Sequence, residues 1–94
     1  MTEEDLPKKH AKTLDKIKHR PILGTIPWAD IKKLFLFLGA EIEQREGSRV
    51  AIILNGTVHV FHEPHPERVT DKGAVSSVKS CLSQHFPDLF KNKK

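Results

Sequence analysis

The chain has 94 residues, of which 37% are hydrophobic and 30% are charged, and its formal net charge is +4. This composition excludes a disordered chain, and the length is sufficient for one modest hydrophobic core. The longest purely apolar run, residues 34–38, is far shorter than the ~20 residues of a membrane-spanning helix, which excludes a membrane protein. The single cysteine excludes an internal disulfide and favours a cytoplasmic protein, while the positive charge favours an anionic partner.

Residues 1–24 are predicted to form a helical extension. Pro7 suits the first position of a helix, and the acidic residues before it complement the positive end of the helix dipole. Ala11, Leu14 and Ile17 form a thin apolar stripe, and the proline at position 21 stops the helix. So thin a stripe does not establish that this helix packs on the rest of the chain.

Residues 25–90 are predicted to form the folded domain, whose first helix begins at Pro27 and ends at Gly39. Five apolar side chains share one face of this helix: Trp28, Ile31, Leu34, Phe35 and Leu38. Leu36 and Phe37 widen the apolar surface. The helix is therefore expected to be either deeply packed or covered by a partner.

Three strands in hairpin order are predicted next. Glu41, Glu43 and Arg45 alternate with the apolar Ala40 and Ile42, as in a strand with one wet face. Residues 49–54 and 57–62 flank the dipeptide Asn55-Gly56, which is a strong signal for a two-residue hairpin turn. The pattern predicts an antiparallel sheet.

A loop and a last helix complete the predicted domain. Pro64 and Pro66 exclude a continued strand and predict an extended loop. Asp71 suits the cap of the last helix, and Pro87 ends it. The apolar stripe of this helix consists of Val75, Val78 and Leu82. The predicted fold is α+β: a three-stranded antiparallel sheet with two helices on one face, preceded by an extra N-terminal helix.

This order of elements resembles the HicA family of toxins, whose fold is that of double-stranded-RNA-binding domains. The resemblance covers about residues 28–86 and is most specific at two dipeptides, the Gly47-Ser48 turn and the His65-Pro66 pair. It implies a dsRBD-like α-β-β-β-α domain that serves as the toxin of a type II toxin–antitoxin system. Such a toxin binds and cleaves mRNA without a metal ion or other cofactor, and its implied protein partner is a HicB-like antitoxin.

The chain departs from the family at the position that carries catalysis. HicA toxins depend on a histidine one or two residues after the Gly-Ser turn, and this chain has Arg49 and Val50 there. A histidine can act as acid or base near neutral pH, which typically accelerates a reaction by ~10²–10⁴-fold. An arginine stays protonated, so Arg49 can bind and stabilise a phosphate but cannot transfer a proton.

Replacement residues for the missing histidine are available nearby. His62 and His65 are predicted to be catalytic, because they can converge with Arg49 at the open edge of the sheet. Ser48 and Arg49 at the turn are predicted to bind RNA. Three N-terminal lysines are predicted to join them on the phosphates: Lys8, Lys9 and Lys12.

The remaining histidines and the cysteine are given structural roles. Val58 and Val60 are expected to face the helices, which would place His59 on the open face of the sheet. The histidines of the last strand and the following loop lack the spacing of strong zinc motifs, so no metal site is predicted. Cys81 is expected to be buried and inert, and His85 is expected to pack or cap at the helix end.

Ordinary alternatives exist for each predicted site residue. His65 can simply hydrogen-bond the loop backbone, and His62 can be a surface residue at a strand end. Arg49 can form an ion pair with Glu43 on the neighbouring strand. The alternative functions are therefore a non-catalytic RNA-binding module of the same fold, or a protein-interaction module that binds an acidic partner.

Overall fold

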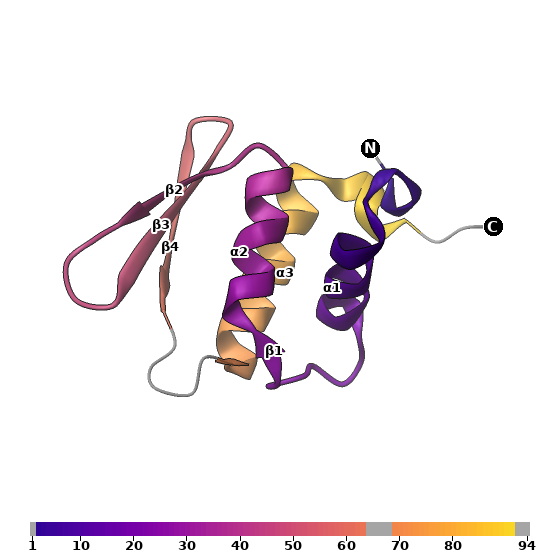
Figure 1. Cartoon of the computed structure of the whole chain (residues 1–94), viewed down its shortest axis with the longest axis horizontal. Helices are drawn as coiled ribbons and strands as arrows, with labels where there is room; N and C mark the ends of the chain where they lie inside the picture. The colour runs from indigo at the N-terminus through magenta and orange to yellow at the C-terminus, as the bar shows by residue number, and fades with distance from the viewer. Residues whose placement is uncertain (1, 64–68, 92–94) are drawn as a thin grey trace.

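The computed structural model describes residues 2–63 and 69–91, which are arranged in layers (Figure 1). A three-stranded sheet lies on one side, and α2 and α3 lie between this sheet and α1. In chain order the elements are η1 (Glu3–Asp5), α1 (Lys8–Lys18), β1 (Ile26–Pro27), α2 (Trp28–Phe37), β2 (Glu41–Gln44), β3 (Arg49–Leu54), β4 (Thr57–His62), β5 (Val69–Thr70), α3 (Lys72–His85) and η2 (Pro87–Phe90).

The sheet is antiparallel with the strand order β2-β3-β4, as the hairpin signals predicted. At the β3–β4 turn, Asn55 and Gly56 both have positive φ, 50° and 79°, which tight two-residue hairpin turns with this dipeptide require. The turn fixes the register of the whole hairpin, whose last pair is Arg49 opposite His62. The two residues of the turn, Asn55 and Gly56, therefore determine which residues face each other at the far end of the hairpin.

Two helices cover one face of this sheet, and their buried residues are those of the predicted stripes. The buried residues of α2 are Trp28, Ile31, Leu34 and Phe35, and those of α3 are Val75, Val78, Cys81 and Leu82. The same core includes four alternate residues of the hairpin, namely Val50, Ile52, Leu54 and Phe61. Gly39 follows α2 with a φ of 94°, the left-handed conformation predicted for a helix end. The predicted α+β fold, with an N-terminal helix before a dsRBD-like domain, is confirmed.

The N-terminal helix α1 packs on both α2 and α3. Leu14 and Ile17 are fully buried in the common core. The Lys18 Nζ donates hydrogen bonds to the Glu3 carboxylate (3.0 Å) and to the Leu89 carbonyl (2.7 Å), so it joins the two ends of the described chain. The division of the chain at residue 24 into an extension and a domain stays a prediction.

The sequence did not predict the short ladder between β1 and β5. Ile26 pairs with Thr70, and Pro27 pairs with Val69. Pro27 therefore ends a strand, and α2 begins one residue later than predicted. This ladder places the start of α3 beside the start of α2, and Asp71 caps α3 as predicted by accepting a hydrogen bond from the Ala74 N–H (2.9 Å).

Candidate functional site

Arg49 and His62 lie directly opposite each other at the end of the β3–β4 hairpin. The Glu63 N–H donates a hydrogen bond to the Ser48 carbonyl (2.6 Å) just beyond this pair. Arg49 and His62 are therefore a non-hydrogen-bonded antiparallel pair, the type whose Cα atoms are ~4.5 Å apart and whose side chains are closest. Both side chains are exposed, so a permanent cation and an imidazole share one solvent-facing spot.

The guanidinium of Arg49 is held by its own turn. Its Nε donates to the Glu46 carbonyl at 3.2 Å. Glu43, the alternative partner of Arg49, instead forms an ion pair with Arg45 (3.2 Å). A charged group fixed at one end by a backbone carbonyl has further N–H donors to offer to an anion.

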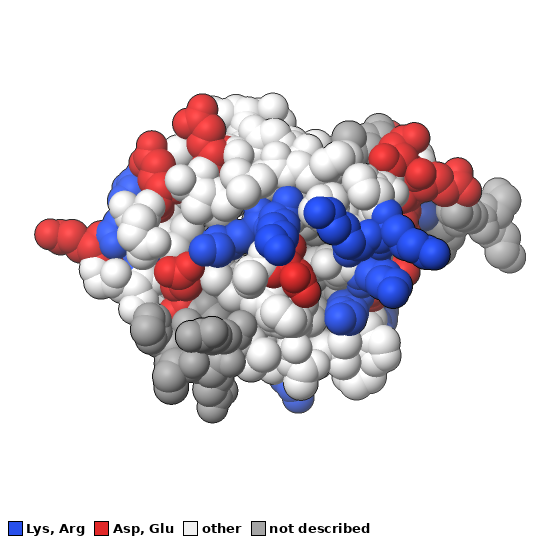
Figure 2. Space-filling model, in the orientation of Figure 1, with Lys and Arg blue, Asp and Glu red and all other residues white. Residues whose placement is uncertain are grey.

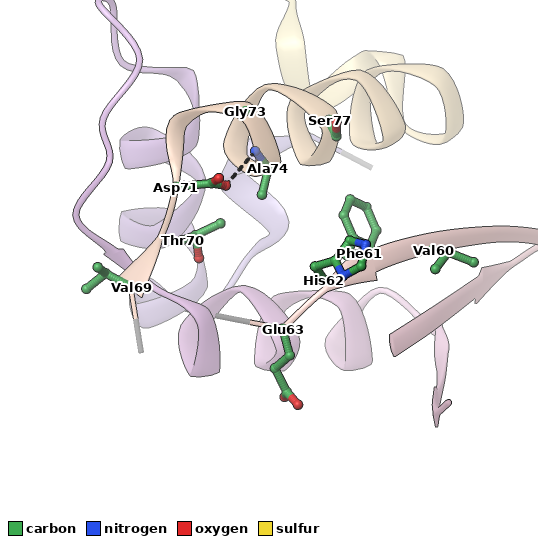
Figure 3. A pocket seen from close by; sticks show the side chains of 10 residues that line it. All are labelled: Val60, Phe61, His62, Glu63, Val69, Thr70, Asp71, Gly73, Ala74 and Ser77. Carbon is green, nitrogen blue, oxygen red and sulfur yellow. Dashed lines mark hydrogen bonds between the residues drawn. The ribbon is translucent and has the colours of Figure 1, made fainter. Parts of the chain in front are cut away.

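A hollow of about 520 Å³ opens beside His62, between the end of β4 and the first turns of α3. Figure 3 shows His62 and Phe61 on one side of it and the start of α3, with Asp71, Gly73 and Ser77, on the other. Thr70 also lines the hollow, and its buried Oγ1 has no hydrogen-bond partner among the described residues. At the start of α3 the Asp71 carboxylate already accepts the Ala74 N–H and also lines the hollow, so the positive charge for a phosphate has to come from Arg49 and His62 at the hairpin end.

Glu63 attaches the end of β4 to α2. Its Oε2 accepts hydrogen bonds from Lys32 Nζ and from Trp28 Nε1, both at 3.1 Å. The hydrogen bond from Lys32 is the main cause that lowers the pKa of Glu63 below its usual range. In Figure 3 the Glu63 carboxylate points away from the other labelled side chains. Glu63 therefore positions the end of β4 and does not act together with the His62 side chain.

The prediction for the two faces of β4 was wrong. Val58 and Val60 are 49% and 52% exposed, whereas Phe61 is buried in the core. The aromatic ring of Phe61 lies between Trp28 and Phe35, with ring centroids at 5.9 and 6.2 Å. The strand is oriented so that Phe61 is buried, because the free energy gained by burying apolar area is larger for this aromatic ring than for the two valines.

His59 shares the helix-facing side of β4 with Phe61 and so is not on the open face. Its Nε2 lies 2.9 Å from the Nε2 of His85 at the end of α3, and the two rings are nearly perpendicular. Burial lowers the pKa of His59, and the charge of His85 adds to this effect. Cys81 is buried as predicted, and burial raises the pKa of its thiol to about 11.

A second basic region lies between α1 and α2. It is a groove of about 220 Å³, and four lysines line it: Lys9, Lys12, Lys16 and Lys33. Figure 2 shows Lys and Arg side chains gathered in a band that crosses the region of α2 and α1 in Figure 1. The sequence predicted a role for the lysines of α1. It did not predict Lys33, which lies on α2 and comes close to these lysines only because α1 packs on α2.

The structure brings together some of the predicted site residues and leaves others apart. Arg49, Ser48 and His62 meet at the hairpin end, whereas Lys9 and Lys12 belong to the α1–α2 groove. The predicted RNA-binding Lys8 is exposed at the first position of α1. The predicted catalytic His65 lies outside the described residues, and its role stays a prediction.

Four large apolar side chains are exposed in the described part of the chain: Leu36, Phe37, Val58 and Val60. Leu36 and Phe37 lie at the end of α2, where the Phe37 ring is 5.0 Å from that of His10. Val58 and Val60 stand on the open face of the sheet, Val60 two residues before His62 and Val58 opposite Ile53 near the β3–β4 turn. Exposed apolar groups of this kind are typical of protein-binding surfaces.

A comparison with known proteins found a family match for the part of the chain that contains this hairpin. The family described as HicA toxin of bacterial toxin-antitoxin matches residues 28–84, from the first residue of α2 nearly to the end of α3. No curated protein and no solved structure matches the chain. Within residues 2–63 and 69–91, each helix is too short or too polar to cross a membrane.

Proposed function

The chain belongs to the HicA family of toxins from bacterial toxin–antitoxin systems, and on this premise we propose that it binds and cleaves mRNA in the cytoplasm without a metal ion. The observation that carries the proposal is the close pair of Arg49 and His62 beside the hollow at the start of α3. The family's usual histidine position holds an arginine here, and a histidine on the partner strand faces it.

The chemistry needs two proton transfers and one electrostatic contact. A base removes the proton of the RNA 2′-hydroxyl, the 2′-oxygen attacks the phosphorus, the bond from phosphorus to the 5′-oxygen breaks, and an acid protonates that oxygen. His62 supplies one of these imidazoles, and we assign the other to His65. Arg49 stabilises the negative charge that grows on the phosphate, a role for which a guanidinium is well suited.

The lysine groove between α1 and α2 extends the proposed RNA contact beyond the reacting phosphate. Lys9, Lys12 and Lys33 line this groove together, so their positive charges can neutralise backbone phosphates. Phosphate contacts of this kind position a nucleic acid and carry no sequence preference by themselves. The proposal therefore places affinity in the groove and chemistry at the hairpin end.

The direct test is RNA cleavage by the purified chain in the presence of EDTA. We expect wild-type protein to cleave RNA and His62→Gln to be ~10²–10⁴-fold slower, because one proton transfer is lost. His19→Gln is the matched control, since His19 is exposed in the loop after α1 and belongs to neither region. Equal rates for wild type and His62→Gln would contradict the assignment of His62.

A second candidate function has its own supporting observation. The residue after the Gly-Ser turn is an arginine that cannot transfer protons, which suits a non-catalytic RNA-binding protein. In that case wild type and His62→Gln both bind RNA, and neither cleaves it in any buffer. Arg49→Gln would then weaken binding, as expected for a phosphate contact.

We also propose that a HicB-like antitoxin covers the open face of the sheet. Val58, Val60 and His62 are alternate exposed residues along this face of β4, so a partner that covers the whole face would block the proposed site. Val58→Lys should weaken antitoxin binding at least 10-fold and leave RNA cleavage intact, because Val58 lines neither hollow nor groove. Retained binding would place the antitoxin on another surface, with the exposed end of α2 as the next one to test.

A further inference from the structure

Three possible metal ligands meet where β4 packs on the end of α3. His59 comes from β4, and Cys81 and His85 lie one turn apart on the same face of α3. One ligand atom from each residue lies within 4.8 Å of the other two, and the two imidazole Nε2 atoms are 2.9 Å apart. This is the one such cluster of histidine, cysteine and acidic side chains in the described part of the chain.

Small side-chain movements bring these distances to those of a tetrahedral site. With metal–nitrogen bonds of about 2.0–2.1 Å and metal–sulfur bonds of about 2.3 Å, tetrahedral ligand atoms are roughly 3.3–3.8 Å apart. The two imidazole nitrogens would therefore separate by a few tenths of an ångström to admit an ion between them. A rotation of two half-buried side chains is sufficient for this, since neither ring is enclosed by the core.

The kinds of ligand also select the ion. Two imidazoles and one thiolate favour borderline-soft divalent ions such as Zn²⁺ and disfavour Mg²⁺ and Ca²⁺, which take oxygen ligands. Cys81 is buried and faces the core, whereas the histidines are partly exposed. The thiolate would lie beneath the ion, and the fourth coordination position would face water. A bound cation deprotonates a coordinating thiol, which overcomes its preference for the protonated form.

We propose that His59, Cys81 and His85 form a binding site for a Zn²⁺-type divalent ion that links the sheet to α3. The site lies where β4 meets the end of α3, whereas the proposed RNA site lies at the hairpin end beside the start of α3, so neither proposal depends on the other. Among the described residues the second nitrogen of each ring has no hydrogen-bond acceptor, and such partners are worth 10–100-fold in metal affinity. We therefore expect a moderate Kd of about 1 µM.

The test uses Co²⁺ as a spectroscopic probe and then Zn²⁺ as a competitor, with untagged full-length protein in its reduced state. Cys81 is the only cysteine of the sequence, so a thiolate-to-cobalt charge-transfer band in the near ultraviolet reports on this residue alone. We expect a 1:1 complex with the visible bands of tetrahedral Co²⁺, which disappear when Zn²⁺ is added. Cys81→Ser should lose the charge-transfer band and bind Zn²⁺ at least 10-fold more weakly, whereas the control His19→Gln should behave as wild type.

A thermal measurement covers the case in which Cys81→Ser does not fold. A ligand at a free concentration of about 100 times its Kd should raise the Tm of a domain of this size by about 10–20 °C. We expect Zn²⁺ to produce this shift in wild type and to lose most of it in His59→Gln and His85→Gln, which keep the cysteine. The proposal is wrong if wild type shows no thiolate band, or if His62→Gln alone abolishes the Zn²⁺ shift.

Discussion

The two faces of β4 use the same kind of residue in opposite ways. On the face toward the helices, His59 meets His85 and stands next to the aromatic cluster around Phe61. On the open face, His62 stands in solvent beside Arg49. One strand therefore holds an imidazole that is tied to the core and an imidazole that is free to meet a substrate.

The difference shows that the neighbours of a histidine decide its chemistry more than its place in the sequence. Burial disfavours the charged form of His59 and brings it a nitrogen and a sulfur as neighbours, which is the environment of a metal ligand. The cross-strand neighbour of His62 is a permanent cation, and a positive charge next to an imidazole suits a residue that contacts a phosphate. Variants on one face can therefore be compared with variants on the other to test these two roles.

The largest effect on stability is expected from the helix-facing side. Phe61→Ala should lower the free energy of unfolding by about 3–5 kcal/mol, because it removes a buried ring from between Trp28 and Phe35. The matched change on the open face, Val60→Ala, should cost less than about 1 kcal/mol, since Val60 is 52% exposed. Urea denaturation of both variants gives the comparison, and equal losses would show that the two faces are not distinct.

A smaller effect, on RNA affinity, is expected from a change in the lysine groove between α1 and α2, which we expect to bind RNA together with the open face of the sheet. Lys33→Gln should weaken RNA binding about 3–10-fold near physiological salt and lower the slope of log K against log salt by about 0.7 for single-stranded RNA. Lys91→Gln is the control, because Lys91 pairs with Asp88 in the C-terminal part of the chain. Fluorescence anisotropy between 50 and 200 mM salt measures both quantities. An unchanged slope in Lys33→Gln would remove the groove from the proposed interface.

The smallest effect concerns the attachment of the β4 end to α2. The pKa of Glu63 is lower in the folded chain than in the unfolded chain, so its ion pair with Lys32 stabilises the fold above the unfolded pKa and is lost as pH falls through the folded value. Glu63→Gln should lower the free energy of unfolding by about 0.5–1 kcal/mol at pH 6 and by less at pH 3.5. Glu41→Gln, at the exposed start of β2, is the control. A difference that grows as the pH falls would contradict this role.

Much of the hairpin end could be predicted from the sequence. A two-residue turn at Asn55-Gly56 pairs Leu54 with Thr57, and counting outward from that pair brings Arg49 opposite His62. The helix stripes were equally readable, because apolar side chains at helical spacing bury one face whatever they pack on.

Two features could not be predicted in this way: which side chains of β4 face the helices, and the approach of His59 to Cys81 and His85. Both alternating sets of β4 contain apolar residues, so periodicity alone does not choose between the two valines and Phe61. The choice is made by Trp28 and Phe35 of α2, which form the space that the ring fills. The spacing of Cys81 and His85 was visible as one helical turn, but their approach to His59 depends on how α3 packs on the sheet.

We propose that Arg49 and His62 act as one unit in RNA cleavage. A double-mutant cycle tests it most directly, with single-turnover cleavage rates of wild type, Arg49→Gln, His62→Gln and the double variant in EDTA. We predict that the double variant is about as slow as His62→Gln alone, since groups that act together give strongly non-additive losses. If the two losses instead multiply, the residues act independently and the proposed site is not a unit.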